Sequence, residues 1–188
     1  MPTRVLRRAP GSPALLPSVV RRMGDALLSE LGLEHAELSV LLSNDQEIHA
    51  LNLRHRGKDR ATDVLAFPLD EGDDPVASGA GPRLLGDVVI SLDTAARQAR
   101  GRKRELVPEV RFLLAHGVLH LIGYDHANPK QKRVMDAMTR RLVRAVERAL
   151  PNARKKETPR RARPLASATG KGRKAGKRAA RPRARHAK

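Results

Sequence analysis

The segment HGVLHLIGYDH, residues 116–126, constrains the fold of this chain more than any other stretch of its sequence. His116 and His120 are four residues apart, which on a helix places both imidazoles on one face, one turn apart. Gly123 then lets the chain leave the helix through a left-handed turn. His126, three residues later, can therefore fold back, and the spacing predicts three imidazoles around one metal ion.

The density of histidines in this segment favours a metal site over a structural role. Three of the seven histidines of the chain fall within these eleven residues, among Leu, Val and Ile side chains that would keep the site dry. Three nitrogen ligands leave one coordination position open, which is typical of catalytic zinc sites. We expect one Zn²⁺ ion bound by His116, His120 and His126, although the ligand type also permits nickel, copper or iron.

The spacing of the histidines and the glycine resembles the HExxHxxGxxH motif of the metzincin zinc proteases. One position departs from it, because Gly117 stands where those proteases carry the glutamate that accepts a proton from the zinc-bound water. The metal ligands are kept, but the base of a protease mechanism is missing. A zinc peptidase-like hydrolase with a displaced base stays open as an alternative.

The rest of the chain predicts an α+β (α/β layered) fold, because strand and helix patterns are interleaved. The run 38–42 is short, apolar and partly β-branched, which predicts a strand buried on both faces. We expect a mixed sheet of about four strands packed with about five helices, all within one domain over residues 1–150. The expected strands are 4–6, 38–42, 61–68 and 84–91, and the expected helices are 15–31, 44–57, 93–100, 108–123 and 129–146.

The net charge of +18 is concentrated at the C-terminus of the chain. Residues 151–188 hold 15 of the 38 Lys and Arg residues but only one of the 20 acidic residues, Glu157. We expect a disordered tail, because such a segment cannot bury enough apolar surface to offset its conformational entropy. Dense positive charge favours non-specific binding of RNA phosphates, and a merely solvated tail is the alternative.

Other compositional features concern the cellular compartment. The chain has no cysteine, which excludes disulfides and thiolate ligands and fits a reducing cytoplasm. No uninterrupted apolar stretch reaches ten residues, so we expect neither a membrane span nor a signal-peptide core. These observations predict a cytoplasmic protein with no membrane partner.

The histidine segment and two upstream blocks together resemble the YbeY family of bacterial endoribonucleases. The upstream blocks are LNLRHRGKDRATDVLAFP, residues 51–68, and LLGDVVIS, residues 84–91, and their order and spacing also fit. The resemblance covers residues 35–127 with specific motifs and 1–150 in outline. One departure is Ala66, where the family often has serine.

The resemblance implies a metal-dependent endoribonuclease directed at single-stranded RNA, acting in 16S rRNA 3′-end processing, ribosome maturation and ribosome quality control. Its partners would be precursor rRNA and the small ribosomal subunit. The metal ligands of the family fall on His116, His120 and His126, and its functional arginine falls on Arg56. A non-catalytic, RNA-binding ribosome-assembly factor with a structural zinc ion is a further alternative.

Residue chemistry leaves several roles open near this site. Arg56 can pair bidentately with phosphate, or it can interact with the dipole at the C-terminal end of its helix. Asp125 can orient an imidazole, cap the last helix or face solvent. Asp63 and Asp87 lie in predicted strands, as hydrogen-bonded core anchors or as groups near the metal. Lys58 can contact RNA phosphate or remain solvated, and no residue is identified as the general base.

Overall fold

The computed structural model describes residues 3–13, 15–69 and 83–151. Residues 70–83 are acidic and rich in Gly and Pro, which predicts a surface loop. Most of this segment and of the predicted tail 151–188 lies outside the described residues. The described part contains four strands and five helices, which confirms the predicted α+β fold. In chain order the elements are β1 (Thr3–Arg7), α1 (Pro17–Glu30), β2 (Glu37–Ser43), α2 (Asp45–Arg56), β3 (Val64–Pro68), β4 (Leu84–Ser91), α3 (Leu92–Gly101), α4 (Leu106–Leu121) and α5 (Pro129–Ala149).

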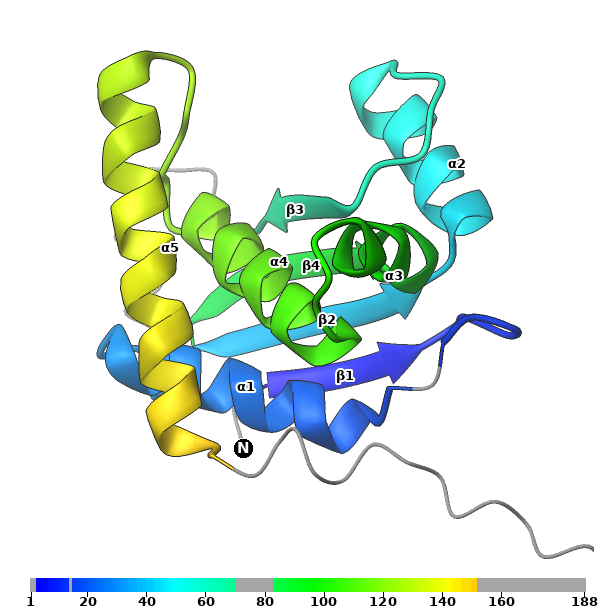
Figure 1. Cartoon of the computed structure of the whole chain (residues 1–188). Helices are drawn as coiled ribbons and strands as arrows, with labels where there is room; N and C mark the ends of the chain where they lie inside the picture. Colours follow the sequence, from blue (N-terminus) through cyan, green and yellow to red (C-terminus); the bar gives the residue numbers. More distant parts are fainter. Residues whose placement is uncertain (1–2, 14, 70–82, 152–188) are drawn as a thin grey trace, which may run out of the picture.

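The strands form one mixed sheet with the order β1-β2-β4-β3. β1, β2 and β4 are parallel, and β3 pairs antiparallel with β4 at one edge. Helices α1 and α4 pack on the same face of this sheet, and α5 packs across both of them (Figure 1). The main core lies between these layers and contains residues such as Leu27, Val88 and Leu114, each fully buried.

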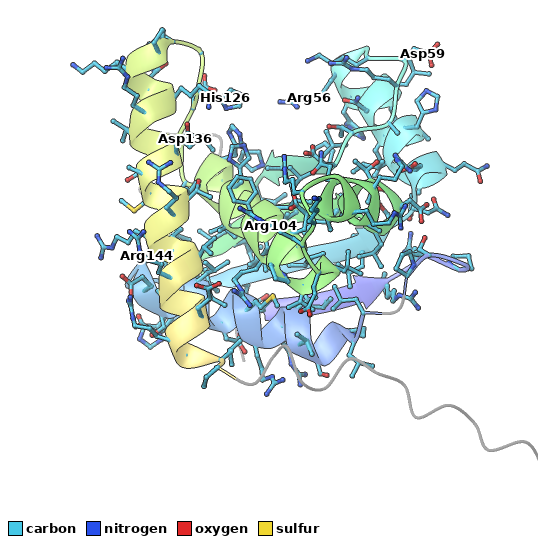
Figure 2. All side chains as sticks on the ribbon, in the orientation of Figure 1. Arg56, Asp59, Arg104, His126, Asp136 and Arg144 are labelled. Carbon is cyan, nitrogen blue, oxygen red and sulfur yellow. The ribbon has the colours of Figure 1, made fainter. Side chains whose placement is uncertain are left out.

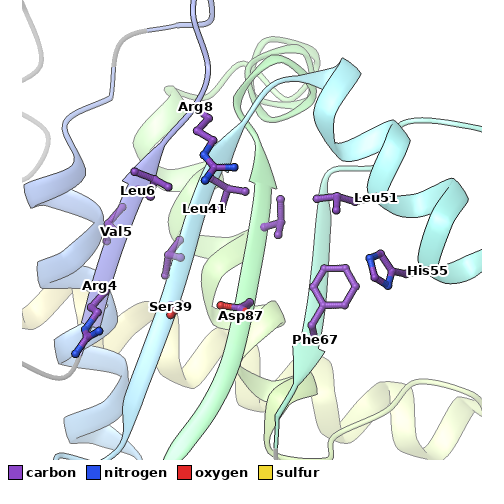
Figure 3. Close-up of a pocket in the computed structure, with 12 residues that line it drawn as sticks. Arg4, Val5, Leu6, Arg8, Ser39, Leu41, Leu51, His55, Phe67 and Asp87 are labelled. Carbon is purple, nitrogen blue, oxygen red and sulfur yellow. The ribbon is translucent and has the colours of Figure 1, made fainter.

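The opposite face of the sheet is open, so the expectation that residues 38–42 are buried on both faces is wrong. Leu38, Val40 and Leu42 are buried, whereas Ser39 is exposed and Leu41 is half-buried. The short apolar run was ambiguous because Leu41, although apolar, points to the face that the helices leave uncovered. That face forms a groove of about 610 Å³ flanked by α2 (Figure 3).

The pairing register of the strands aligns a basic, a hydroxyl, an acidic and an aromatic side chain in one row across the floor of the groove. Arg4 pairs with Ser39, Ser39 with Asp87, and Asp87 with Phe67 (Figure 3). His55 of α2 packs edge-on against Phe67, with ring centroids 5.0 Å apart. The predicted strand position of Asp87 is confirmed, and its side chain lies on this open face.

Helix α2 is fixed at both ends by local interactions. Asn44 is its N-cap, as expected, and its Oδ1 accepts a hydrogen bond from the N–H of Glu47 at 2.9 Å. Asp45 fastens this end to α3, because its carboxylate accepts hydrogen bonds from Ser91 Oγ at 2.6 Å and Thr94 Oγ1 at 2.7 Å. Gly57 ends the helix in the left-handed conformation at φ 63°.

Strand β3 begins at Val64, three residues later than expected. Asp63 precedes the strand instead of lying within it, and its Oδ1 accepts a hydrogen bond from the N–H of Val64 at 2.9 Å. The loop before it is held by Asn52, whose Nδ2 donates to the carbonyl of Arg60 at 2.8 Å. Pro68 is the last residue of β3, which is tolerated because β3 is an edge strand.

Helices α4 and α5 follow the predicted pattern with a small shift at one boundary. α4 begins at Leu106, so Pro108 lies within its first turn instead of opening it. Gly123 has φ 87°, which confirms the expected left-handed turn after α4. Asn128 caps α5 by accepting hydrogen bonds from the N–H groups of Lys130 and Gln131. No helix in the described part of the chain is both long and apolar enough to cross a membrane.

Candidate metal centre

The three histidines predicted as ligands converge at the C-terminal end of α4. His116 and His120 come from the last two turns of the helix, and His126 comes from the connection to α5. One potential ligand atom from each residue lies within 4.8 Å of those of the other two. Their ring centroids are 4.9, 5.1 and 5.7 Å apart. This arrangement can hold one metal ion.

The backbone around the ligands is held by close packing and by hydrogen bonds. Gly117 lies against the sheet, and a β-carbon built on it would stand 2.7 Å from Cγ1 of Val88. After the helix, the N–H of Tyr124 donates to the carbonyl of Leu119 at 3.0 Å. These contacts place α4 close to the strands and turn the following loop back toward the helix, which brings His126 to the other two histidines.

Burial keeps the imidazole of His116 in the neutral form that can bind a metal. Desolvation is the main cause that lowers the pKa of His116 to about 4, and the nearby His120 and His126 add to the effect. Burial also lowers the pKa of His120. Nδ1 of His116 is buried and has no hydrogen-bond partner among the described residues. A neutral imidazole without a competing protein partner fits a metal ligand.

A pocket of about 430 Å³ surrounds the three histidines. Arg56 and Lys58, from the end of α2 and the residues after it, line the pocket together with the ligands. Figure 2 shows Arg56 across the opening from His126. Burial is the main cause that lowers the pKa of His120, His126 adds to it, and the positive charge of Arg56 makes a smaller contribution in the same direction.

The other residues considered from the sequence occupy different places. Asp63 lines the pocket, and its Oδ2 accepts a hydrogen bond from Gln98 Nε2 at 2.9 Å. Asp125 uses Oδ1 to accept the backbone N–H of His126 at 2.7 Å, whereas the same oxygen is 3.9 Å from Nδ1 of that ring. Asp125 therefore supports the loop directly, and its suggested action on an imidazole stays a prediction. Asp87 lies on the open sheet face.

Phe112 is a neighbour of the site that sequence reasoning missed. Its side chain is 36% exposed, and its ring is 6.1 Å from that of His116 with an interplanar angle of 12°. The signal was present in the sequence, because Phe112 precedes His116 by four residues and so shares its helical face. The apolar spacing of Phe112 predicted only the helix, because spacing alone does not show which apolar side chains stay exposed.

The site combines three imidazoles with two cationic side chains and suits an anionic substrate. Guanidinium and ammonium groups beside a metal position can bind and stabilise phosphoryl oxygens. A peptide carbonyl would not require two such cations. The geometry therefore favours a phosphodiester over a peptide.

Comparison with known proteins agrees with this chemistry. The sequence model of the family described as Endoribonuclease YbeY matches residues 13–147. The chain belongs to the YbeY family. A YbeY relative named endoribonuclease from Anaeromyxobacter sp. (strain Fw109-5) is 52% identical over 126 residues, covering 67% of this chain but only 62% of that relative.

A second curated relative and one solved structure are also similar to this chain. The YbeY endoribonuclease of Aquifex aeolicus is 49% identical over 107 residues, which cover 57% of this chain and 67% of that protein. The solution structure of TM1509 from Thermotoga maritima is similar with a TM-score of 0.57 and 25% identity. It covers 86% of this chain and 99% of that protein, so the likeness extends over the whole α+β layer structure.

Proposed function

We propose that this YbeY-family protein is a metal-dependent endoribonuclease that cleaves single-stranded RNA. Its substrate would be precursor rRNA of the small ribosomal subunit, processed at the 16S 3′ end during ribosome maturation and quality control. The observation that carries the proposal is the convergence of His116, His120 and His126 in one pocket with Arg56. Residues 1–150 would form the catalytic domain, in the cytoplasm.

Zinc is the metal that we propose for the three histidines. Nitrogen ligands at three positions with a fourth left open are the usual donor set of catalytic zinc, which supplies Lewis acidity for hydrolysis. The lowered pKa of His116, to about 4, means that this side chain needs no deprotonation before binding at pH 7. The closeness of the three possible ligand atoms, within 4.8 Å of one another, also supports this proposal.

Arg56 and Lys58 would bind the scissile phosphate opposite the metal ligands. Arg56 is the last residue of α2 and is exposed, so its side chain can reach a bound strand without a large desolvation penalty. Its planar guanidinium can contact two phosphate oxygens at once, whereas Lys58 contributes a point charge. These contacts would orient the strand and stabilise the charge that develops on the phosphoryl group.

A peptidase-like reaction is disfavoured by the surroundings of Gly117. A protease-like glutamate at this position would meet Val88 and Val64, because even a β-carbon would lie 2.7 Å from Val88 Cγ1 and 3.3 Å from Val64 Cγ2. The helix therefore cannot carry the protease base in its usual place. Only a base from another element would rescue this alternative, and casein digestion by the purified protein would reveal it.

The decisive experiment compares the full chain with Arg56→Ala, Arg56→Lys and Arg54→Ala variants on a single-stranded rRNA fragment. Arg54 is a matched control, because it is exposed on the same helix but does not line the pocket. We expect Arg56→Ala to lower the cleavage rate about 100-fold or more, Arg56→Lys to recover part of it, and Arg54→Ala to retain it. Full cleavage by Arg56→Ala, with unchanged zinc content, would remove Arg56 from the catalytic machinery, whereas absence of cleavage by the original zinc-loaded protein would favour a non-catalytic assembly factor.

The basic segment 151–188 would add sequence-independent RNA affinity. We propose this from its 15 Lys and Arg residues, because each phosphate contact releases counterions. Removing the residues after Pro151 should weaken RNA binding and flatten its dependence on salt. Equal affinity of both chains at low and at high salt would show that the segment does not contact RNA.

A further inference from the structure

We propose that Phe112 is a nucleobase-stacking subsite beside the metal centre. The inference rests on the proposed ribonuclease function and deepens it, because it assigns a residue that selects unpaired RNA. Bases in a duplex are stacked on one another, whereas bases of a single strand are free to stack on an aromatic side chain. A stacking residue next to the cleavage site would therefore discriminate between the two.

Aromatic side chains are scarce in this chain, and only one is placed for this role. The sequence contains two Phe, one Tyr and no Trp. Tyr124 is partly buried against the main core, and Phe67 lies on the open sheet face beside His55. Phe112, by contrast, keeps 36% of its surface exposed and stacks with a predicted metal ligand.

The geometry of Phe112 aligns it with the site. Phe112 and His116 occupy one face of α4, and their ring planes differ by only 12° with centroids 6.1 Å apart. A base stacked on Phe112 would therefore lie nearly parallel to the His116 imidazole. His116 lines the pocket that also holds Arg56, so a base on Phe112 would stack one helical turn from this pocket, beside it and not within it.

The charges on the part of α5 that faces His116 would not repel a nucleic acid bound at Phe112. Asp136 is close enough to His116 to influence its pKa, but the carboxylate is paired with Lys132 at 2.8 Å. Arg140, one turn further along α5, also acts on Asp136 electrostatically. Two cations thus accompany this acidic group of α5, so its negative charge is offset at this wall of the site.

A simpler role for Phe112 would be to support the His116 ring. The absence of tryptophan from the chain allows an experiment that separates the two roles. A Phe112→Trp variant carries a single tryptophan at the proposed subsite, and Phe67→Trp carries one on the open sheet face as the control; the tryptophan is excited selectively over Tyr124. Both are titrated, in the full-length protein as purified, with a 2′-O-methylated single-stranded octanucleotide.

We expect bound RNA to quench the emission of Phe112→Trp and to leave that of Phe67→Trp unchanged. Phe112→Ala should weaken binding of the octanucleotide about tenfold, within the range of one stacked base, and Phe112→Tyr should restore it. The zinc content of all variants should equal that of the original protein. An octanucleotide with an abasic site at the stacked position should bind the original protein and Phe112→Ala equally.

Three results would overturn the subsite. If Phe112→Ala binds RNA normally while Arg56→Ala binds it weakly, stacking at Phe112 is wrong and the ribonuclease proposal stands. If Phe112→Ala loses zinc, and adding zinc restores its RNA affinity, the ring only supports His116. If the original protein does not bind the octanucleotide at all, the proposed function fails and the subsite fails with it.

Discussion

Gly117 and Val88 are in such close contact that no side chain fits between them: a β-carbon on Gly117 would lie 2.7 Å from Cγ1 of Val88. The contact joins α4 to the central strand β4 in the turn that carries His116 and His120. The same residue that distinguishes this motif from that of the zinc proteases is therefore required for packing.

Gly117→Ala should lower the free energy of unfolding, because an added methyl in a packed core costs about 1–3 kcal/mol. The higher helix propensity of alanine returns up to about 1 kcal/mol of this. Zinc affinity should fall as well, since α4 must shift with its ligands. Urea unfolding and metal titration test both effects. Gly101→Ala is the control, because a β-carbon there meets nothing within 4 Å, and it should leave zinc affinity unchanged without lowering the free energy of unfolding.

His126→Ala should remove bound zinc without unfolding the metal-free protein. The side chain of His126 is 51% exposed and comes from a loop, so its loss should change the stability of the metal-free protein by less than about 0.5 kcal/mol. Metal analysis of the purified protein and urea unfolding with a chelator provide the two readouts. His35→Ala, at an exposed position, should retain the metal, and retention of zinc by His126→Ala would remove that residue from the ligand set.

Asp45→Asn should destabilise the junction of α2 and α3 by about 1–2 kcal/mol at pH 7, since solvent screens part of this interaction. Burial acts to raise the pKa of Asp45, but hydrogen bonds from Arg97, Ser91 and Thr94 outweigh it and leave the pKa below its ordinary value. A lowered carboxyl pKa stabilises the fold above the ordinary value of 3.8, and this contribution is lost as the pH falls through the lowered pKa.

The difference in free energy of unfolding between the original protein and Asp45→Asn should therefore be largest at neutral pH. It should become smaller as the pH is lowered below 3.8. Urea unfolding at several pH values measures it. Asp59→Asn is the comparison, because that side chain is 79% exposed and pairs only with a surface histidine among the contacts described. A gap that widens on acidification would contradict the assigned pKa direction.

Arg102→Ala should destabilise the connection between α3 and α4. Arg102 pairs with Glu109, whose side chain is only 1% exposed, so the substitution leaves a buried carboxylate without this cation. Because the side chain of Arg102 is itself 50% exposed, we expect a loss of about 1–2 kcal/mol, less than for a fully buried pair. Thermal unfolding should show a clear decrease for Arg102→Ala and little change for Arg100→Ala, which is exposed on the neighbouring turn.

Helix ends could be predicted from the sequence, because they depend on residues close in the chain. The burial of a strand face could not, because it depends on which distant elements pack against it. Asn44, Gly57, Gly123 and Asn128 marked helix ends correctly, because caps and left-handed turns act within a few residues. The open face of β2 was not predictable, since an apolar run does not reveal whether a helix covers it. Only the assembled sheet shows that Leu41 faces the groove.

For the candidate site, too, the residues close together in the sequence could be predicted and the distant ones could not. The three histidines could be grouped from spacing alone, because a helix and one turn bring them together. Arg56 required the family resemblance, since sixty residues separate it from His116 and no local pattern links the two. Asp63 was misplaced in a strand, and the packing role of Gly117 needed its contact with β4.

Strand β3 has a single hydrogen-bonded neighbour, β4, among the described strands. It lies between Arg56, at the end of α2, and the three histidines of the candidate metal centre. Val64, Ala66 and Pro68 of this strand line the same pocket as Arg56 and the histidines. The strand therefore acts as a spacer whose position sets the width of the opening. If the proposed function holds, substitutions in the β3–β4 pair would change which RNA strands fit while leaving the three histidines and Arg56 unaltered.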